Sequence, residues 1–544
     1  MIFRRFLSCA TVALGMMAAC HAANIATVNA PAGILRGATE DTLRVFKDVP
    51  YAKPPVGALR WRAPVPLPRW KGVKSASAFG PECVQPESKI ASVYSSDPIP
   101  MSEDCLSLNI WTPKNAHHAP VFFWIYGGAL WGGASADPIY DGTQLAKRGV
   151  VVVTINYRVG VLGWLAHREL SAENPLHVSG NYGLLDQIQA LRWVKRNIAA
   201  FGGDPANVTI AGESAGGLSV MYLMASPVAR GLFAKAIAQS AYMVSTPALR
   251  EAKYGALSAE DSGQALADAL HASSVAALRA MNPATLTGAA AAARFAPFGA
   301  VDGRVLPAQL VDVFDKGEQA HVPIMAGFNA GEIRALRLLA PPVPASAADY
   351  ENTIRAQYGD LSDAFLKLYP SSNMQESIWA TTRDALYGWT AERLVRKQTA
   401  AGERSFLYIF DHGYPAEDEA GLHAFHGSEL PFVFGTTDRT PKQWPKIPAT
   451  SDEAKLSDAM LEYWASFARA AEPRASNEPD WPAFDATNSY MNFTDAPHPA
   501  DHPMPGMYSL NEEVMCRRHA IGTIAWNWNV GLASPPLPPK AGCD

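Results

Sequence analysis

A serine between two glycines is the first feature of this sequence that suggests catalysis. Residues 212–216 read Gly-Glu-Ser-Ala-Gly and directly follow the apolar, β-branched run at 208–211. This pattern predicts a strand, a sharp turn and a helix, with Ser214 held on the turn as a nucleophile because the glycines relieve crowding. The backbone N–H of Ala215 would then face an oxyanion forming beside the serine. The bare motif is equally compatible with a glycine-rich turn that has no chemical role.

The flanking residues extend this motif. Segment 201–217 reads FGGDPANVTIAGESAGG. It resembles the serine signature of the type-B carboxylesterase family, which includes the cholinesterases and bacterial para-nitrobenzyl esterases. Residues 46–57 and 59–61 match the family's N-terminal pattern, and the resemblance extends from about Val28 to Pro539. It implies an α/β-hydrolase fold and the hydrolysis of carboxylic esters.

By the same resemblance, a glutamate and a histidine complete a catalytic triad. Glu332 follows an expected strand at 322–327 and matches the catalytic glutamate of the family's Gly-x-Asn-x-x-Glu segment, although Ile333 replaces a frequent glycine. His426 matches the family's histidine that is followed by two residues and Glu-Leu, so we prefer it to the neighbouring His423. The order serine, glutamate, histidine is the nucleophile, acid, base order of α/β-hydrolases.

A glycine-rich loop supplies the remaining part of the expected site. The buried-strand pattern at 121–125 leads into YGGALWGG at 126–133, which lacks the Lys-Ser/Thr ending of a phosphate loop and the spacing of a dinucleotide site. By the resemblance, the N–H groups of Gly128 and Ala129 join that of Ala215 in an oxyanion hole. Ala129 replaces the usual glycine, which keeps the donor and costs about 1 kcal/mol if the position requires a positive φ.

The elements that must position these residues alternate along the chain. Continuous apolar runs at 121–125 and 150–155 indicate strands buried on both faces, and apolar residues recur at helical spacing within 184–201. The nucleophile follows the next strand, at 208–211. We therefore predict an α/β-hydrolase fold, with a large, mostly parallel central sheet flanked by helices. Helical insertions such as the Ala-rich stretch 254–295 would form a gorge or cap.

The first residues are typical of an export signal. Two arginines precede an apolar stretch at 6–19, which is short for a membrane span, and we expect cleavage after Ala22. We predict a signal peptide at 1–22 and a secreted or periplasmic protein of a bacterium, because the signal is short and Ala-rich and the resemblance includes bacterial members. The alternative is a lipoprotein, since residues 16–20 can be interpreted as a lipobox with Cys20 acylated.

The remaining chain, 23–544, shows no linker, repeat or block of charge that would divide it, so we predict one domain with long insertions and a C-terminal tail. Its 48% hydrophobic residues are sufficient for a large core. Helices expected at 458–468 and 514–526 complete the fold. We find no other apolar run long enough to span a membrane.

Four cysteines lie beyond the signal region, and in an exported chain they allow up to two disulfides. Segment 103–110 resembles a second signature of the family, whose cysteine closes a short loop with one upstream; this implies a bond between Cys83 and Cys105. Closing that loop constrains the unfolded chain by about 3 kcal/mol in the entropy model. Cys516 and Cys543 then remain as the second expected pair.

Composition argues against other functions. The formal net charge of −5 gives no basic surface for nucleic acid, the His-x-x-His at 423–426 lacks further metal ligands nearby, and we expect no metal or cofactor.

We predict a serine esterase that acts on small-molecule esters through an acyl-enzyme. The alternatives are a catalytically silent, cholinesterase-like binding or adhesion protein, and a specialised lipase or detoxifying esterase for one bulky ester. The natural substrate and the oligomeric state stay open.

Overall fold

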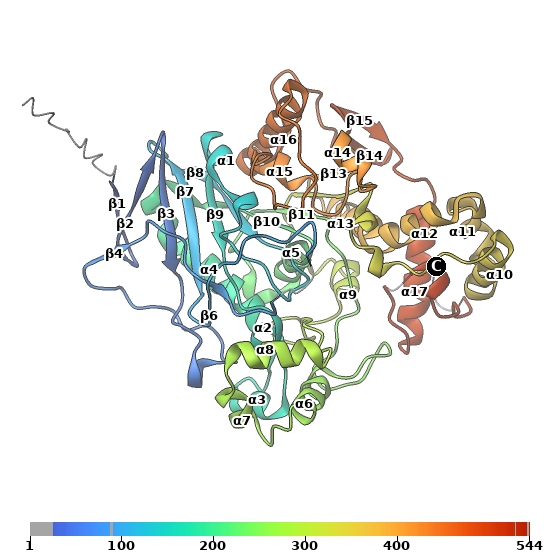
Figure 1. Ribbon diagram of the computed structural model, residues 1–544, viewed down its shortest axis with the longest axis horizontal. Coiled ribbons are helices and arrows are strands. Elements are labelled where there is room, and N and C mark those ends of the chain that lie inside the picture. The colour runs from blue at the N-terminus through green and yellow to red at the C-terminus, as the bar shows by residue number, and fades with distance from the viewer. Residues whose placement is uncertain (1–24, 88–90, 528, 541–542, 544) are drawn as a thin grey trace, which may run out of the picture.

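A computed structural model of the chain describes residues 25–87, 91–527, 529–540 and 543 (Figure 1). The signal peptide expected at 1–22, and the cysteine of the alternative lipoprotein signal within it, lie outside these residues. Across the described ranges, no helix combines the length and the apolar content that are needed to cross a membrane.

Strands and helices alternate through most of the chain. The strands are β1 (Ile25–Ala30), β2 (Gly33–Glu40), β3 (Leu43–Pro50), β4 (Val73–Ser75), β5 (Glu82–Cys83), β6 (Met101–Ser102), β7 (Ser107–Pro113), β8 (Ala119–Ile125), β9 (Val151–Ile155), β10 (Gly203–Glu213), β11 (Lys235–Gln239), β12 (Ile324–Asn329), β13 (Ser405–Phe410), β14 (Ser489–Phe493) and β15 (Pro497–Asp501). The helices are α1 (Thr143–Lys147), α2 (Gly160–Trp164), α3 (Arg168–Glu173), α4 (Tyr182–Asn197), α5 (Ala215–Ala225), α6 (Ala259–Ala269), α7 (Val275–Ala280), α8 (Pro283–Ala292), α9 (Leu310–Asp315), α10 (Ala347–Tyr358), α11 (Ser362–Leu368), α12 (Met374–Arg383), α13 (Trp389–Ala400), α14 (Pro415–Glu419), α15 (Leu430–Phe434), α16 (Ser451–Ala470) and α17 (Met507–Ile521).

Among the described residues, 13 strands form one sheet in the order β1-β2-β3-β7-β9-β8-β10-β11-β12-β13-β14-β15, with β4 paired to β2. The neighbours from β9 to β14 run parallel. The strands β1, β2, β3 and β7 add an antiparallel edge, and β15 returns antiparallel to β14. This is the large, mostly parallel sheet of an α/β-hydrolase, as the sequence predicts.

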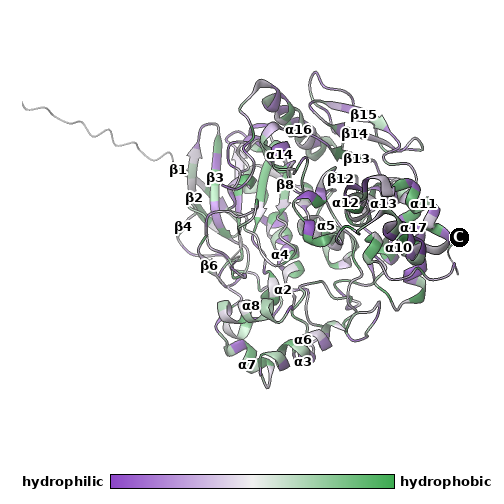
Figure 2. Cartoon of the chain, turned by 45° about the vertical axis from the view of Figure 1, so that its right-hand side comes forward, coloured by the Kyte–Doolittle hydropathy of each residue, from purple (hydrophilic) through white to green (hydrophobic). Residues whose placement is uncertain are grey.

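Side chains of β8 show how the sheet is buried on both faces. Val121, Phe123 and Ile125 point into one core, which α4, α5 and α13 cover, whereas Phe122 and Trp124 point into the other, which α1, α15 and α16 cover. All five are fully buried, and the strand carries the hydrophobic colour in Figure 2. Because alternate residues face opposite sides, a continuous apolar run is what a strand between two helical layers requires.

The helical insertion expected at 254–295 is present as α6, α7 and α8. Together with α2 and α3 these helices form a lobe beside the sheet (Figure 1) with an apolar core of its own, which includes Leu266, Val275, Leu278 and Leu286. Trp131, in the loop after β8, and Val161 of α2, which follows β9, pack into this core, so the lobe contacts the loops at the carboxyl ends of these two strands.

The prediction of a helix at 514–526 is wrong at both ends. The observed helix α17 runs from Met507 to Ile521 and stops at Gly522, which takes the left-handed backbone with φ of 69° and donates its N–H to the Arg518 carbonyl. A glycine in this conformation is a common way to end a helix, because it lacks a Cβ.

A buried ion pair joins the segment after β9 to α4. Arg158 donates from Nε and Nη2 to the two carboxylate oxygens of Asp186, both at 2.7 Å. The side chains are 4% and 0% exposed, and Nη2 of Arg158 also donates to the Arg62 carbonyl. Both charges lie away from water, and each is compensated by the other. The loss of one partner therefore leaves an uncompensated buried charge.

We therefore expect Asp186→Ala to lower the free energy of unfolding by about 3–5 kcal/mol. Guanidinium denaturation followed by tryptophan fluorescence measures the change. The matched control is Asp97→Ala, which removes an ion pair with Lys442 that is exposed on both sides and should change stability little. Equal losses in the two variants would contradict a special role for the buried pair.

Candidate active site

Ser214 stands on a strained turn between β10 and α5. Its φ is 56° and its ψ is −121°, a conformation that costs a residue other than glycine on the order of 1–3 kcal/mol. Glycines flank it because the backbone is crowded: a Cβ at Gly216 would collide with the Ile125 carbonyl, and one at Gly212 would collide with Gly216. The turn places the serine at the carboxyl end of the sheet, with 9% of its surface exposed.

Hydrogen bonds tie this turn to the neighbouring strands. The N–H of Ser214 donates to the Gln239 carbonyl at the end of β11, at 2.9 Å. The Gln239 side chain donates to Glu429 at 2.9 Å and accepts from Trp464 at 3.0 Å. Asn329, at the end of β12, donates to the other oxygen of Glu429 at 2.7 Å. The ends of three elements are thereby fixed relative to one another.

Glu332 and His426 meet at the same end of the sheet. Glu332 follows β12, is fully buried and accepts from the N–H of Asn329 at 2.9 Å. Its other oxygen is hydrogen-bonded to Nδ1 of His426. His423, the alternative base, instead contacts two exposed aspartates. Of the two histidines, it is His426 that the structure brings to the glutamate.

The other ring nitrogen of His426 faces Glu213. Its Nε2 lies 3.0 Å from Oε1 of Glu213, although the two groups are out of line for a hydrogen bond. Within the described ranges, no hydrogen bond joins His426 to Ser214. Since Glu213 directly precedes Ser214, the imidazole nevertheless lies next to the turn that carries the serine.

Three carboxyl groups surround this one imidazole. Burial raises the pKa of Glu213, His426 opposes this increase, and the charges of Glu429 and Glu332 add to it. Burial also disfavours the charged form of His426, but the negative charges of Glu213 and Glu332 outweigh it and raise the pKa of the imidazole. The site is therefore built to stabilise a positive charge on His426.

The loop after β8 passes directly beside the serine. A Cβ built on Gly127 would lie 3.0 Å from Cβ of Ser214. Gly128 has a φ of 95° and Ala129 one of 53°, so Ala129 does occupy a position with positive φ, at a cost of about 1 kcal/mol. In the described part of the chain, no group accepts from the amides of Gly128, Ala129 or Ala215, which leaves them available to an oxyanion.

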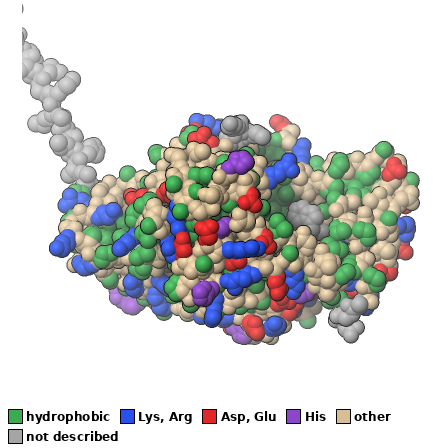
Figure 3. Space-filling view, turned by 90° about the horizontal axis from the view of Figure 1, so that it is seen from below, with side chains coloured by type: hydrophobic (Ala, Val, Ile, Leu, Met, Phe, Trp, Pro, Cys, Tyr) green, Lys and Arg blue, Asp and Glu red, His purple; other side chains and the backbone are tan. Residues whose placement is uncertain are grey.

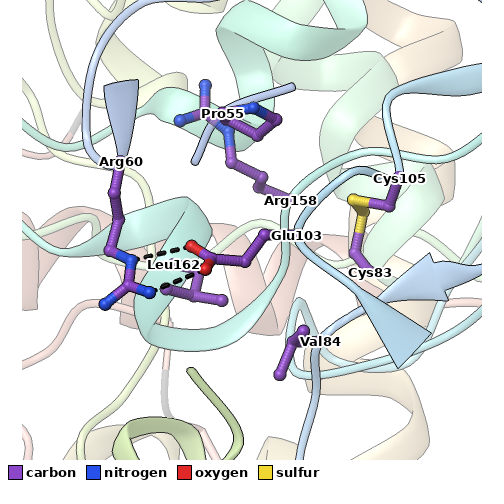
Figure 4. Close-up of a pocket in the computed structure, with 8 residues that line it drawn as sticks. All are labelled: Pro55, Arg60, Cys83, Val84, Glu103, Cys105, Arg158 and Leu162. Atoms are coloured by element: carbon purple, nitrogen blue, oxygen red, sulfur yellow. Dashed lines mark hydrogen bonds and ion pairs between the residues drawn. A yellow bond between two sulfur atoms is a disulfide. The ribbon is translucent and has the colours of Figure 1, made fainter. Parts of the chain in front are cut away.

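A disulfide and an ion pair anchor a second loop near this site. The structure joins Cys83 to Cys105, and Cys516 of α17 to Cys543. Beside the first bond, Arg60 donates from Nε and Nη2 to the two oxygens of Glu103, at 2.7 and 2.6 Å (Figure 4). Further donations from Arg60 to carbonyls at the end of α7 connect the base of this loop to the helical lobe.

Two tyrosines that the sequence did not single out contact His426. Tyr94, inside the disulfide-closed loop, donates its hydroxyl to the His426 carbonyl at 2.8 Å. The ring centroid of Tyr387, in the π-helical turn Asp384–Gly388, lies 5.1 Å from that of the imidazole. Neither tyrosine belongs to a local motif. The sequence did contain a signal for Glu429, by contrast, because this residue is the glutamate of the His-x-x-Glu-Leu pattern.

The fold and the arrangement at its carboxyl edge define an α/β-hydrolase. A family model described as "Carboxylesterase family" matches residues 24–507. Fumonisin B1 esterase of Sphingopyxis macrogoltabida is 36% identical over 467 residues, covering 84% of each chain. Para-nitrobenzyl esterase of Bacillus subtilis (strain 168) is 35% identical over 462 residues, covering 83% of this chain and 91% of the relative.

Solved structures agree with these sequence comparisons. A structure of PNB esterase superposes with a TM-score of 0.77 at 32% identity, covering 89% of this chain and 99% of the other. Carboxylesterase EST55 of Geobacillus stearothermophilus gives a TM-score of 0.72, also at 32% identity and with the same coverage. The chain belongs to the carboxylesterase family and is a carboxylic ester hydrolase.

The carboxylates around His426 predict how ester hydrolysis depends on pH. A histidine base acts in its neutral form, so kcat/KM should fall as the pH drops through its raised pKa. Glu213→Gln removes a negative charge that favours the imidazolium, and the acidic limb of the pH profile should move down by about one unit. Profiles with para-nitrophenyl acetate measure this. Glu462→Gln on α16, a half-buried glutamate that pairs with Arg148 and Arg469, should leave the limb in place. A limb that Glu213→Gln also leaves in place contradicts the electrostatic account.

Proposed function

We propose that this protein is an exported serine esterase in which Ser214, His426 and Glu332 form the catalytic triad. The observation that carries the proposal is the buried hydrogen bond between Glu332 and His426, next to a serine on a strained turn. Free amides line the other side of that serine. Esters are the favoured substrates because an alkoxide is a better leaving group than an amine.

Each residue has a defined role in the proposed reaction. His426 accepts the proton of the Ser214 hydroxyl as its oxygen attacks the ester carbonyl, and then donates that proton to the departing alcohol. The acyl-enzyme that remains is hydrolysed by a water molecule that the same histidine deprotonates. Glu332 holds the proton on Nδ1, which leaves Nε2 free to act as the base, and it stabilises the imidazolium.

The proposal requires Nε2 of His426 to turn from Glu213 toward Ser214. In that position the Ser214 hydroxyl donates to the unprotonated Nε2, and Ser214 directly follows Glu213 in the chain. Catalytic hydrogen bonds are often poorly aligned without substrate and tighten when it binds. The buried carboxylate of Glu213 would meanwhile favour the imidazolium that forms in the transition state, where it contributes to the rate.

The oxyanion hole in this proposal consists of the amides of Gly128, Ala129 and Ala215. Each such donor contributes about 3–4 kcal/mol to the transition state when it faces the developing charge. The left-handed backbone at Gly128 and Ala129 turns two successive amides to the same side of the loop. Because the donors belong to the main chain, the replacement of glycine by alanine at 129 keeps the hole intact.

Two other functions stay as alternatives. A catalytically silent binding or adhesion protein would have no use for the retained triad, of which two members are hydrogen-bonded to each other. A specialised lipase or detoxifying esterase for one bulky ester is compatible with the same site. The named substrates of the relatives, fumonisin B1 and para-nitrobenzyl esters, support small-molecule esters as the general class.

We also propose that the chain acts as one domain, 23–544, after removal of a signal peptide at 1–22. Disulfides between Cys83 and Cys105 and between Cys516 and Cys543 support folding in an oxidising compartment, which means secretion or the periplasm. Acylation of Cys20, as in a lipoprotein, is the alternative. No cofactor, metal or nucleic acid has a part in the proposed reaction.

The test is hydrolysis of para-nitrophenyl acetate, butyrate and octanoate by the purified mature protein and by Ser214→Ala. We expect the substitution to lower kcat by roughly 10⁴-fold or more, because it removes the nucleophile. The matched control is Ser219→Ala on α5, whose buried hydroxyl accepts from Gln187 and should affect stability rather than the rate. If Ser214→Ala is folded and as fast as the wild type, the serine mechanism is wrong.

A further inference from the structure

A cavity of about 500 Å³ lies between α6, the segment 293–298 after α8, and residues 525–527 after α17. Its volume is in the range of small-molecule binding pockets. Most of its wall is apolar, and Leu257 and Phe298 at its edge are 56% and 37% exposed. The space-filling view from the side of the helical lobe shows a hollow with hydrophobic walls (Figure 3).

One wall of this cavity adjoins the oxyanion loop. The ring of Phe295, which lines the cavity, lies 6.3 Å from the ring of Trp131. The N–H of Trp131 donates to the Gly128 carbonyl at 2.9 Å, within the turn that presents the free amides. The cavity is thus one aromatic layer away from the amides proposed to hold the acyl oxygen.

A second wall adjoins the histidine. Val244 and Ser245 line the cavity, and they follow Tyr242 in the chain. The ring of Tyr242 lies 6.1 Å from that of Tyr387, which in turn lies 5.1 Å from the ring of His426. Two aromatic rings, those of Tyr242 and Tyr387, thus connect this wall to the imidazole.

The residues that line the cavity carry a positive charge without a negative one. Arg294 is the one charged residue among those that line the cavity, and no carboxylate accompanies it there. Its side chain has no ion pair with any described residue, unlike Arg279 or Arg334, which pair with Glu173 and Glu376. In a chain of net charge −5, an unpaired cation on an apolar wall favours an anion at that point.

A buried amide supplies a second donor. Asn527 is 6% exposed, and its Oδ1 accepts from the Ser245 N–H at 2.9 Å. This contact fixes the orientation of the amide, and no described residue accepts from its Nδ2. The Nδ2 group is therefore available to donate to a ligand atom that accepts hydrogen bonds. Arg294 and Asn527 thus offer hydrogen-bond donors beside an apolar surface.

We propose that this cavity binds the acyl arm of esters whose apolar chain ends in a carboxylate, that is, half-esters of dicarboxylic acids. The chain would lie against Phe295 and Leu266, and the carboxylate would meet Arg294 and the Asn527 amide. We assign the acyl side because Trp131 connects the cavity to the amides that hold the acyl oxygen. This inference rests on the proposed function of Ser214.

The experiment compares two series of para-nitrophenyl esters that differ in the terminal carboxylate. The neutral series is butyrate, hexanoate and octanoate, and the anionic series is the half-esters of succinate, adipate and suberate. For each chain length, the ratio of kcat/KM for the anionic ester to that for the neutral one is measured in the wild type, Arg294→Gln and Arg304→Gln. Arg304 is an exposed arginine outside the cavity without an ion pair, so its variant controls for net charge.

We expect Arg294→Gln to lower this ratio about tenfold for the chain length that spans the cavity, mainly by raising KM for the half-ester, because the lost interaction is a charge-assisted hydrogen bond. Arg294→Glu should lower it further, and Arg304→Gln should leave it as in the wild type. An unchanged ratio in Arg294→Gln at every length, or an equal fall in Arg304→Gln, overturns the proposal. Failure of the proposed function differs from both, because Ser214→Ala would then hydrolyse the two series as fast as the wild type.

Discussion

The backbone of Ser214 is the constraint on which the rest of the site depends. A left-handed conformation is unfavourable for serine, and it persists because β8, β10 and α5 approach so closely that only glycine fits at 212 and 216. The same close approach brings the loop after β8 against the serine at Gly127. Strain at one residue and the position of the amide donors therefore have a common cause, which is the packing of the helix start on two parallel strands.

Buried negative charge is the second organising feature. Glu213, Glu332 and Glu429 lie around one imidazole, although carboxylates are costly to bury. Neutral amides make this arrangement possible: Asn329 donates to both Glu332 and Glu429, from its backbone and its side chain respectively. The resulting field favours the imidazolium, which is the species that the proposed proton transfer from Ser214 creates. In the proposed mechanism, charge that would only destabilise an ordinary core thereby contributes to catalysis.

Most of the fold and the turn at Ser214 could be predicted from local patterns, because these features depend on neighbours in the sequence. The apolar run at 121–125 requires a strand buried on both faces, and the glycines around Ser214 require a tight turn. The contact of Tyr94 with His426 joins residues 332 positions apart and depends on how a disulfide-closed loop folds back, which no local pattern encodes. The end of α17 was predicted too late because apolar residues continue beyond Gly522, where the backbone turns away.

The most direct test of the account is the mass of the purified protein after reaction with diethyl para-nitrophenyl phosphate, followed by peptide mapping. The account predicts one diethylphosphoryl group per chain, attached to Ser214, because the reagent needs both an activated serine and an oxyanion hole. The Ser214→Ala protein should gain no mass. Modification at another residue, or no modification of a folded protein that hydrolyses esters, would contradict the assignment of Ser214 as the nucleophile.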